Sequence, residues 1–365
     1  MTTLTDQPER EEGRRTRSRR VMVMIATPLG PELVAPIRAV DGPLEVLFEP
    51  DLLPPPRFPC DHRGVATFRR THEQELRWQK MLGSAEVLFG VPGDSGEGLA
   101  DVIRTNLGLR WVQATAGGIG QQVHAAGLTV EELDRVLITG ASGVHAGPLA
   151  EFALFGVLAF TKGLPRLLGD TEARRWEHYP MAELADQTLL VVGLGSIGTK
   201  VARLAKAFGM HVIAVNRTGR TDVHDVDEVR PSRFLGDLLP VAHAVVLTLP
   251  LTEETRGLID THAISRMRTG AIMVNVGRGG VVDEDALVQA LEQGRLAGAA
   301  LDVFAIEPVP QDSPLWRLPN VLISPHTAAL SVRENERIVS VFTENLRRYL
   351  RGDDLIGRVL PTELY

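Results

Sequence analysis

The stretch "VVGLGSIG" (residues 191–198) places three glycines at the spacing G-x-G-x-x-G directly behind an apolar run. An amphipathic pattern follows it and ends at Gly209, which can cap a helix. In such a strand, loop and helix, Gly193 allows a tight turn, Gly195 lets the backbone approach a pyrophosphate and Gly198 lets the helix pack closely on the sheet. The alternative is a glycine-rich turn that only permits close packing. We therefore predict a dinucleotide-binding loop that opens a Rossmann unit.

The next predicted strand, "HVIAVN" (211–216), bears on which dinucleotide binds. An acid that holds the ribose hydroxyls of NAD is expected about 20 residues after the glycine loop. Asn216 and Arg217 occupy this region instead, and no carboxylate is there to repel a 2′-phosphate. Arg217 can pair with that phosphate for about 1.5–3 kcal/mol, or about ten- to hundredfold in affinity. The sequence therefore favours NADP over NAD, unless Arg217 and Arg220 form only a solvated turn.

Short apolar runs alternate with helical patterns on both sides of this region. Before it, strands are predicted at "VMVMIA", "LEVLFE", "AEVLFGV", "RWVQAT" and "RVLITGA", and after it at "AHAVVLTLP", "AIMVNVG", "AGAALDVF" and "NVLISPH". Strands separated by helices indicate parallel sheets and an α/β fold. The stretch 147–168 is apolar nearly all round, which predicts one buried helix. Residues 331–352 form a long amphipathic pattern that can return to pack on the first unit.

These patterns predict one domain inserted into another. We expect a disordered tail over residues 1–20, a substrate domain made of 21–145 and 326–365, and a nucleotide-binding domain over 146–325. The two crossings between the domains fall near Ala146 and His326.

Composition limits the classes of partner. The chain has 365 residues and a formal net charge of −7, which argues against general affinity for nucleic acid or an anionic membrane. No apolar run reaches the length of a membrane span. The single cysteine, Cys60, cannot form an internal disulfide and indicates a reducing, cytoplasmic location. The ten histidines show no metal-binding spacing, so we expect no metal site.

Three polar residues follow predicted strands of the second unit, where open α/β sheets hold ligands. Arg278 lies between glycines after one strand, Glu307 lies five residues past Asp302, and His326 stands at the second crossing. Each residue alone has an ordinary reading, as a surface charge, a helix-capping acid or a loop histidine. Taken together, and in this order after the glycine loop, the three residues are candidates for one functional site.

Together with "LPLTEETRGLID" (249–260) and "NVGRGGVVDEDALVQAL" (275–291), these stretches are similar to those of the D-isomer-specific 2-hydroxyacid dehydrogenases. The resemblance covers nearly the whole chain after the first 20 residues. It implies a Rossmann domain inserted into a flavodoxin-like α/β catalytic domain, and reduction of small 2-keto acids of the glyoxylate or hydroxypyruvate type to D-2-hydroxy acids.

The resemblance also implies roles for individual residues. Arg278 would bind the substrate carboxylate and polarise the keto oxygen. His326 would protonate that oxygen as hydride arrives, and Glu307 would orient the imidazole and stabilise its positive charge. Residues expected near the cofactor are Gly193, Gly195, Ser196, Ile197, Gly198, Asn216, Arg217, Thr218, Arg220, Thr248, Leu249, Pro250, Thr255, Val276, Gly277 and Asp302. Residues expected near the substrate, besides Arg278 and His326, are Val91, Pro92, Gly117 and Gly118.

Several alternatives stay open. Formate dehydrogenase has glutamine where Glu307 stands, and a phosphoglycerate-type enzyme would find few arginines in the loop "QATAGGIG" (113–120). A silent NAD(P)-sensing binding protein on the same fold would not need the three polar residues together. His145, near the first crossing, is expected to act at a hinge or behind the site. The helix near 147–168 is expected to form a homodimer contact, as in the family.

Overall fold

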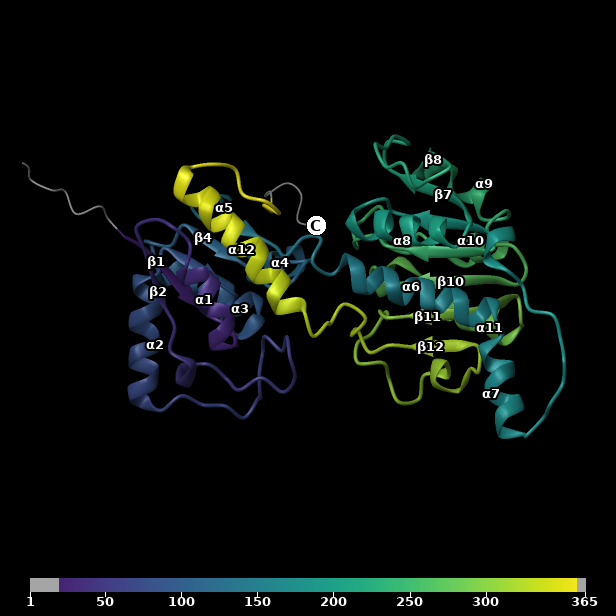
Figure 1. The fold of residues 1–365 in the computed structure, drawn as a ribbon, viewed down its shortest axis with the longest axis horizontal. Helices are drawn as coiled ribbons and strands as arrows, with labels where there is room; N and C mark the ends of the chain where they lie inside the picture. The colour runs from purple at the N-terminus through teal and green to yellow at the C-terminus, as the bar shows by residue number, and fades with distance from the viewer. Residues whose placement is uncertain (1–19, 360–365) are drawn as a thin grey trace, which may run out of the picture.

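The computed structural model describes residues 20–359, which form two parallel sheets with helices on both faces of each (Figure 1). All of the tail predicted for residues 1–20 except Arg20 lies outside the described residues.

The first sheet has the strand order β2-β1-β3-β4-β5, and all its pairs are parallel. This order is the flavodoxin-like one, in which the direction of winding reverses between β1 and β3. Its strands are β1 (Val21–Ile25), β2 (Leu44–Leu47), β3 (Val87–Phe89), β4 (Trp111–Gln113) and β5 (Leu137–Thr139). The helices around it are α1 (Pro31–Arg38), α2 (His72–Ser84), α3 (Gly96–Thr105), α4 (Gly120–Ala126), α5 (Val130–Arg135) and α12 (Glu334–Arg351).

The second sheet has the order β12-β11-β10-β9-β6-β7-β8, again with parallel pairs. This is the Rossmann order with one added strand, and its reversal lies between β6 and β9. The strands are β6 (Thr188–Val192), β7 (His211–Asn216), β8 (Glu228–Pro231), β9 (Ala244–Leu247), β10 (Ala271–Asn275), β11 (Leu296–Leu301) and β12 (Val321–Ile323). The helices are α6 (Ala146–Thr161), α7 (Leu164–Glu172), α8 (Ser196–Ala207), α9 (Leu235–Leu238), α10 (Thr261–Arg266) and α11 (Glu284–Glu292).

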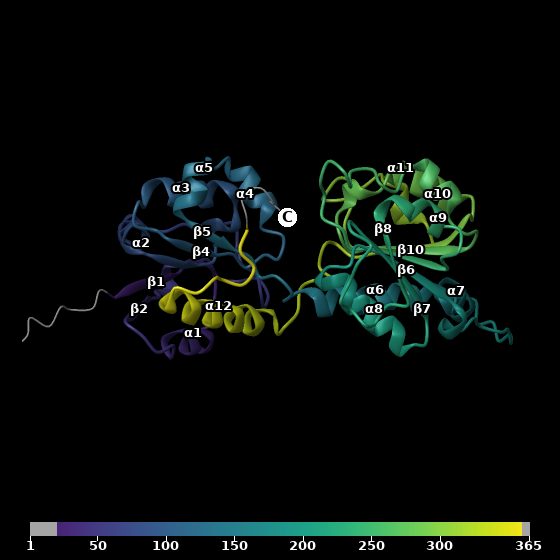
Figure 2. The same cartoon turned by 90° about the horizontal axis from the view of Figure 1, so that it is seen from above.

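Apolar side chains fill the space between each sheet face and its helices. Figure 2 shows α1 and α12 on one face of the first sheet and α2 and α3 on the other, with α6 and α8 opposite α10 and α11 in the second domain. Phe342 of α12 stacks on Trp111 at a ring-centroid distance of 5.0 Å and meets Phe89 edge-on. This aromatic packing returns the last helix to the first sheet, so the chain crosses between the domains twice.

The single buried helix predicted over 147–168 is wrong in its extent. The structure has two helices there, α6 and α7, bent by 61°. Gly163 adopts φ +68°, a left-handed conformation that ends a helix, and Pro165 cannot donate the backbone hydrogen bond that a continuous helix requires. α6 lies against α8 and the sheet, yet Phe155 is 51% exposed, and no residue of α7 is buried.

Within residues 20–359, no single helix is long and apolar enough to cross a membrane, and only the bent pair α6 and α7 passes that test jointly.

Candidate active site

Loops that follow five strands of the second sheet meet at one edge of it, because all these strands run parallel. They are the loops after β6, β9, β10, β11 and β12, and they lie on the side of this domain that faces the first domain (Figures 1 and 2). The predicted site residues of the second domain come from these loops and from the end of β7.

The glycine loop has the shape that a pyrophosphate needs. Gly193 has φ +102°, and a Cβ at Gly198 would lie 2.0 Å from the Gly193 carbonyl oxygen, so neither position tolerates a side chain. A Cβ at Gly195 would meet no atom within 4 Å. Gly195 precedes the first residue of α8, Ser196, and both are exposed. The backbone at the start of this 12-residue helix is therefore open to an anion, and these residues fit a dinucleotide.

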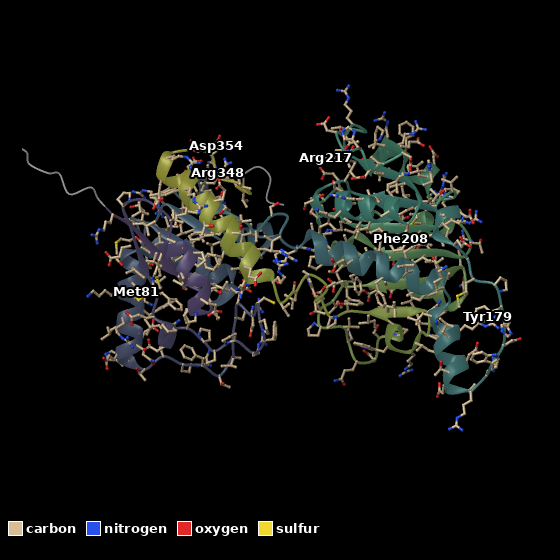
Figure 3. All side chains as sticks on the ribbon, viewed as in Figure 1. Met81, Tyr179, Phe208, Arg217, Arg348 and Asp354 are labelled. Carbon is tan, nitrogen blue, oxygen red and sulfur yellow. The ribbon has the colours of Figure 1, made fainter. Side chains whose placement is uncertain are left out.

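Asn216, at the end of β7, stabilises the turn that presents two arginines. Its Oδ1 accepts from the backbone N–H groups of Thr218 (3.1 Å) and Gly219 (2.6 Å), and its Nδ2 donates to the Arg220 carbonyl (2.8 Å). Arg217 and Arg220 are exposed and form no ion pair with any described residue. Figure 3 places Arg217 at the border of the second domain nearer the first domain.

The segment after β9 borders the glycine loop. The Thr248 hydroxyl donates to the Gly193 carbonyl at 2.7 Å, and Leu249 is among the nearest neighbours of a Cβ built at Gly193. Thr255 closes the following turn, because its hydroxyl donates to the Pro250 carbonyl at 2.7 Å. The structure thus brings these residues to the reversal point between β6 and β9. Ile197 is half-buried against the core under α8.

Arg278 reaches across to the first domain. Its guanidinium Nη1 donates to the Gly277 carbonyl at 2.7 Å, and a Cβ built at Gly118 would lie only 2.2 Å from its Nη2. Burial lowers the pKa of this guanidinium, and the negative charge of Glu307 opposes that shift. A half-buried cation next to the backbone at Gly118 is arranged to receive a carboxylate.

Glu307 and His326 form the predicted pair. His326 Nδ1 lies 2.7 Å from Glu307 Oε2, while the other carboxylate oxygen accepts from the Phe304 backbone N–H at 3.0 Å. The side chains of His326 and Glu307 are 46% and 36% exposed, so a small molecule can reach the imidazole. The carboxylate fixes the orientation of the ring.

Asp302 is buried and contacts the segment that carries His326. Its Oδ1 accepts from the Ser324 hydroxyl (2.6 Å) and from the backbone N–H groups of Thr327 and Ala328 (2.9 Å each). The described contacts of Asp302 thus hold both sides of the histidine, and the cofactor contact expected for it stays a prediction.

Two predicted residues are buried among apolar side chains, and the contacts expected for them stay predictions. Val276 is buried with the apolar residues under α6 and α8, and Val91 is buried in the first domain between the sheet and α3. Pro92 is more exposed and lines a pocket of the first domain. Cys60 is buried, and burial together with the negative charge of Glu334 raises its thiol pKa to about 11, which disfavours the reactive thiolate.

Sequence reasoning missed two buried positioning groups. Asn275 donates from Nδ2 to the Arg278 carbonyl (3.0 Å) and accepts from the Gly277 N–H (3.0 Å), which fixes the turn that presents the arginine. Glu334, at the start of α12, lies 3.3 Å from His145 Nε2 and 3.5 Å from His62 Nε2. In the sequence, Asn275 and Glu334 are each marked only as a polar residue within or beside an apolar pattern. His145 therefore joins the first crossing to the helix that follows the second.

No group of three or more His, Cys, Asp or Glu residues that could hold a metal ion occurs in the described part of the chain.

Comparison with known proteins agrees with this geometry. The sequence model of the "D-isomer specific 2-hydroxyacid dehydrogenase, NAD binding domain" matches residues 154–328. A glyoxylate reductase of Korarchaeum cryptofilum is 37% identical over 224 residues, which are 60% of this chain and 67% of that protein. A D-3-phosphoglycerate dehydrogenase of Methanocaldococcus jannaschii is 33% identical over 240 residues, 63% of this chain but 46% of that protein.

A solved structure extends the likeness to both domains. The D-isomer specific 2-hydroxyacid dehydrogenase from Xanthobacter autotrophicus Py2, crystallised with NADPH and MES, aligns with a TM-score of 0.74 and 26% identity over 94% of this chain and 99% of that one. The fold and the site define an NAD(P)-dependent oxidoreductase of the α/β class. The chain belongs to the D-isomer specific 2-hydroxyacid dehydrogenase family. The predicted family, fold class and enzyme class are confirmed.

Proposed function

We propose that this protein is an NADPH-preferring reductase of small 2-keto acids of the glyoxylate or hydroxypyruvate type, with D-2-hydroxy acids as products. The observation that carries the proposal is the Glu307–His326 pair near the half-buried guanidinium of Arg278, at the edge that also carries the glycine loop. One relative is named glyoxylate reductase, which supports the substrate class.

Each residue has a separate task in this reaction. Arg278 and the backbone at Gly117 and Gly118 bind the substrate carboxylate, and the guanidinium polarises the keto oxygen. The imidazolium of His326 gives its proton to that oxygen, and Glu307 holds the ring in place through Nδ1. When bound, the reduced nicotinamide supplies the hydride to the keto carbon.

The cofactor is held by the open helix start at Gly195 and by the arginines after β7. Arg217 and Arg220 are exposed and have no carboxylate partner among the described residues, so they are available to a 2′-phosphate. The Xanthobacter relative, crystallised with NADPH, supports this preference. NAD binds more weakly in this proposal because it lacks the phosphate.

We further propose that the substrate domain comprises residues 21–145 and 326–365 and that the domain 146–325 closes on it about hinges near Ala146 and His326. A second copy of the chain would cover α6 at a hollow of about 430 Å³, which is lined by the exposed side chains of Phe155 in α6 and Leu330 before α12. Light scattering at micromolar concentration should therefore give the mass of a dimer, and a monomer would contradict this contact.

The main experiment measures the oxidation of NADPH and NADH with glyoxylate, hydroxypyruvate and pyruvate. We expect kcat/KM to be about ten- to hundredfold higher with NADPH, because one charge-assisted pair is worth about 1.5–3 kcal/mol. Arg217→Ser should remove most of that preference without lowering the activity with NADH. Arg317→Ser removes an equal charge at the exposed end of a short 3₁₀ helix (Pro314–Arg317) and is the control.

Other outcomes would favour other functions. Equal efficiency with both cofactors would contradict the role of Arg217. Activity confined to 3-phosphohydroxypyruvate would favour the phosphoglycerate-type alternative. The Methanocaldococcus relative is named as an enzyme of that type. If no keto acid is reduced although NADPH binds, the chain is a nucleotide-sensing protein and the proposal fails.

A further inference from the structure

The loop after β4 that contains Gly117 and Gly118 is contacted from two sides, and we call it the carboxylate loop. A Cβ built at Gly118 would lie 2.2 Å from Arg278 Nη2. A Cβ built at Gly117 would lie 3.0 Å from His145 Nδ1 and 3.8 Å from Cε1 of the same ring. The imidazole of His145 therefore occupies the space that a side chain at Gly117 would fill. Arg278 reaches the loop from the second domain, whereas His145 reaches it from the first crossing between the domains.

The segment that carries His145 runs along the carboxylate loop. The Ala141 backbone N–H donates to the Ala116 carbonyl at 3.0 Å, and the Ala141 carbonyl oxygen would lie 3.7 Å from a Cβ at Gly117. His145 directly precedes α6, but its side chain makes no capping hydrogen bond to that helix. The side chain is only 14% exposed. Its ring is thus packed behind the carboxylate loop rather than on the end of α6.

Glu334 holds the other edge of the His145 ring. Its Oε1 lies 3.3 Å from His145 Nε2, and its side chain is 3% exposed at the start of α12, which packs on the first sheet. Burial raises the pKa of Glu334, but its contacts with His145 and His62 lower it to about 2, so Glu334 is a carboxylate at neutral pH. Because a carboxylate only accepts hydrogen bonds, it orients the His145 ring with Nε2 toward α12 and Nδ1 toward Gly117.

A second imidazole contacts the same carboxylate and provides an internal comparison. His62 Nε2 lies 3.5 Å from Glu334 Oε1, while His62 Nδ1 lies 3.3 Å from the Thr27 hydroxyl oxygen after β1. His62 is not among the nearest neighbours of a Cβ built at Gly117. The two rings thus share Glu334, and of the two it is His145 that reaches the carboxylate loop.

We propose that His145 is a positioning residue for the 2-keto acid: held by Glu334, its ring keeps the Gly117 backbone where the substrate carboxylate binds. A misplacement of 1 Å in an active site can cost about 10²-fold, so a smaller shift of the loop should cost about tenfold. The loss falls on KM, because the carboxylate is bound equally in the ground state and in the transition state. This inference rests on the proposed reductase activity and adds a residue that supports its substrate site from behind.

The test is a double-mutant cycle on the KM for glyoxylate at saturating NADPH. His145→Ala should raise KM about tenfold with kcat within threefold of the wild type. Gly117→Ala should also raise KM about tenfold, because its methyl group would lie 3.0 Å from His145 Nδ1 and the loop must shift; Gly117 has no positive φ, so alanine fits its backbone conformation. In the double variant the methyl group fills part of the space that the ring leaves, so we expect a KM no higher than that of either single variant. Independent effects would instead multiply to about a hundredfold.

His62→Ala is the matched control, because it removes the other imidazole that contacts Glu334. We expect its KM for glyoxylate to stay within twofold of the wild type, and Gly117→Ala to raise KM as much in this background as in the wild type. Thermal unfolding and NADPH titration show whether each variant is folded. If His145→Ala does not fold, His145→Ser takes its place, since serine is favoured at the residue before a helix.

The outcomes separate this inference from the proposed function. A KM for His145→Ala within twofold of the wild type overturns the inference, as does a hundredfold rise in the double variant. Equal effects of His145→Ala and His62→Ala, or a loss of kcat at unchanged KM, also overturn it, and in all these cases the reductase proposal stands. If the wild type reduces none of glyoxylate, hydroxypyruvate and pyruvate, the proposed function fails and this inference fails with it.

Discussion

The contact between Gly118 and Arg278 gives the sharpest mutational prediction. A Cβ at Gly118 would lie 2.2 Å from Arg278 Nη2, whereas unstrained heavy atoms stay about 3.5 Å apart. Gly118→Ala therefore displaces the end of the guanidinium by about 1 Å. Since a misplacement of 1 Å in an active site can cost about 10²-fold, we expect kcat/KM for glyoxylate to fall about a hundredfold, or about 2.7 kcal/mol in transition-state stabilisation.

The fold should tolerate this substitution, because the displaced atom is the end of a flexible side chain. We therefore expect the melting temperature and the affinity for NADPH to stay unchanged while kcat/KM falls. Gly83→Ala is the matched control: the same methyl group added in α2 meets no atom within 4 Å. Steady-state kinetics, thermal unfolding and NADPH titration on the three proteins make the measurement.

A kcat/KM for Gly118→Ala within threefold of the wild type would refute the reasoning, because Arg278 would then not need its observed position. A large loss of thermal stability would also refute it, since the displacement would have reached the backbone.

Two further predictions concern proton transfer and acid stability. His326→Ala should lower kcat by about 10²–10⁴-fold with NADPH binding unchanged, as expected for loss of a general acid, and a smaller loss in stopped-flow single turnovers would exclude that role. Two opposing effects act on the pKa of Glu334, which is 3% exposed. Burial alone would raise the pKa, but the contacts with His145 and His62 have the larger combined effect. The pKa therefore lies at about 2, below the ordinary 4.5. Because the folded-state value is the lower one, the resulting stability, about 3 kcal/mol, is present above pH 4.5 and is lost as the pH falls toward 2. Denaturant unfolding should show a steeper acid dependence in the wild type than in Glu334→Gln, and equal slopes would contradict the assignment.

Much of the fold could be predicted from local patterns. The strands of both sheets except β8 correspond to short apolar runs, and the glycine spacing located the start of α8. β8 was missed because "EVRP" has only four residues, ends in proline and shows no clear alternation. The helix pattern over 147–168 was read too far, because apolar residues continue past Gly163 and hide the left-handed turn at that glycine.

Arg278, Glu307 and His326 could be predicted as site residues, because each follows a strand that is recognisable in the sequence. Contacts between segments that are distant in the sequence could not be predicted. The contact of Glu334 with His145 joins residues 189 positions apart, which no local pattern can indicate.

The central claim is that Arg278, Glu307 and His326 act together on one keto acid. A crystal structure of the protein with NADPH and oxamate, an unreactive analogue of a 2-keto acid, tests it most directly. The oxamate carboxylate should bind Arg278 and the backbone at Gly118, with its carbonyl oxygen about 2.6–3.2 Å from His326 Nε2. Oxamate bound away from Arg278, or beyond hydrogen-bonding reach of the imidazole in a complex with cofactor bound, would contradict the account.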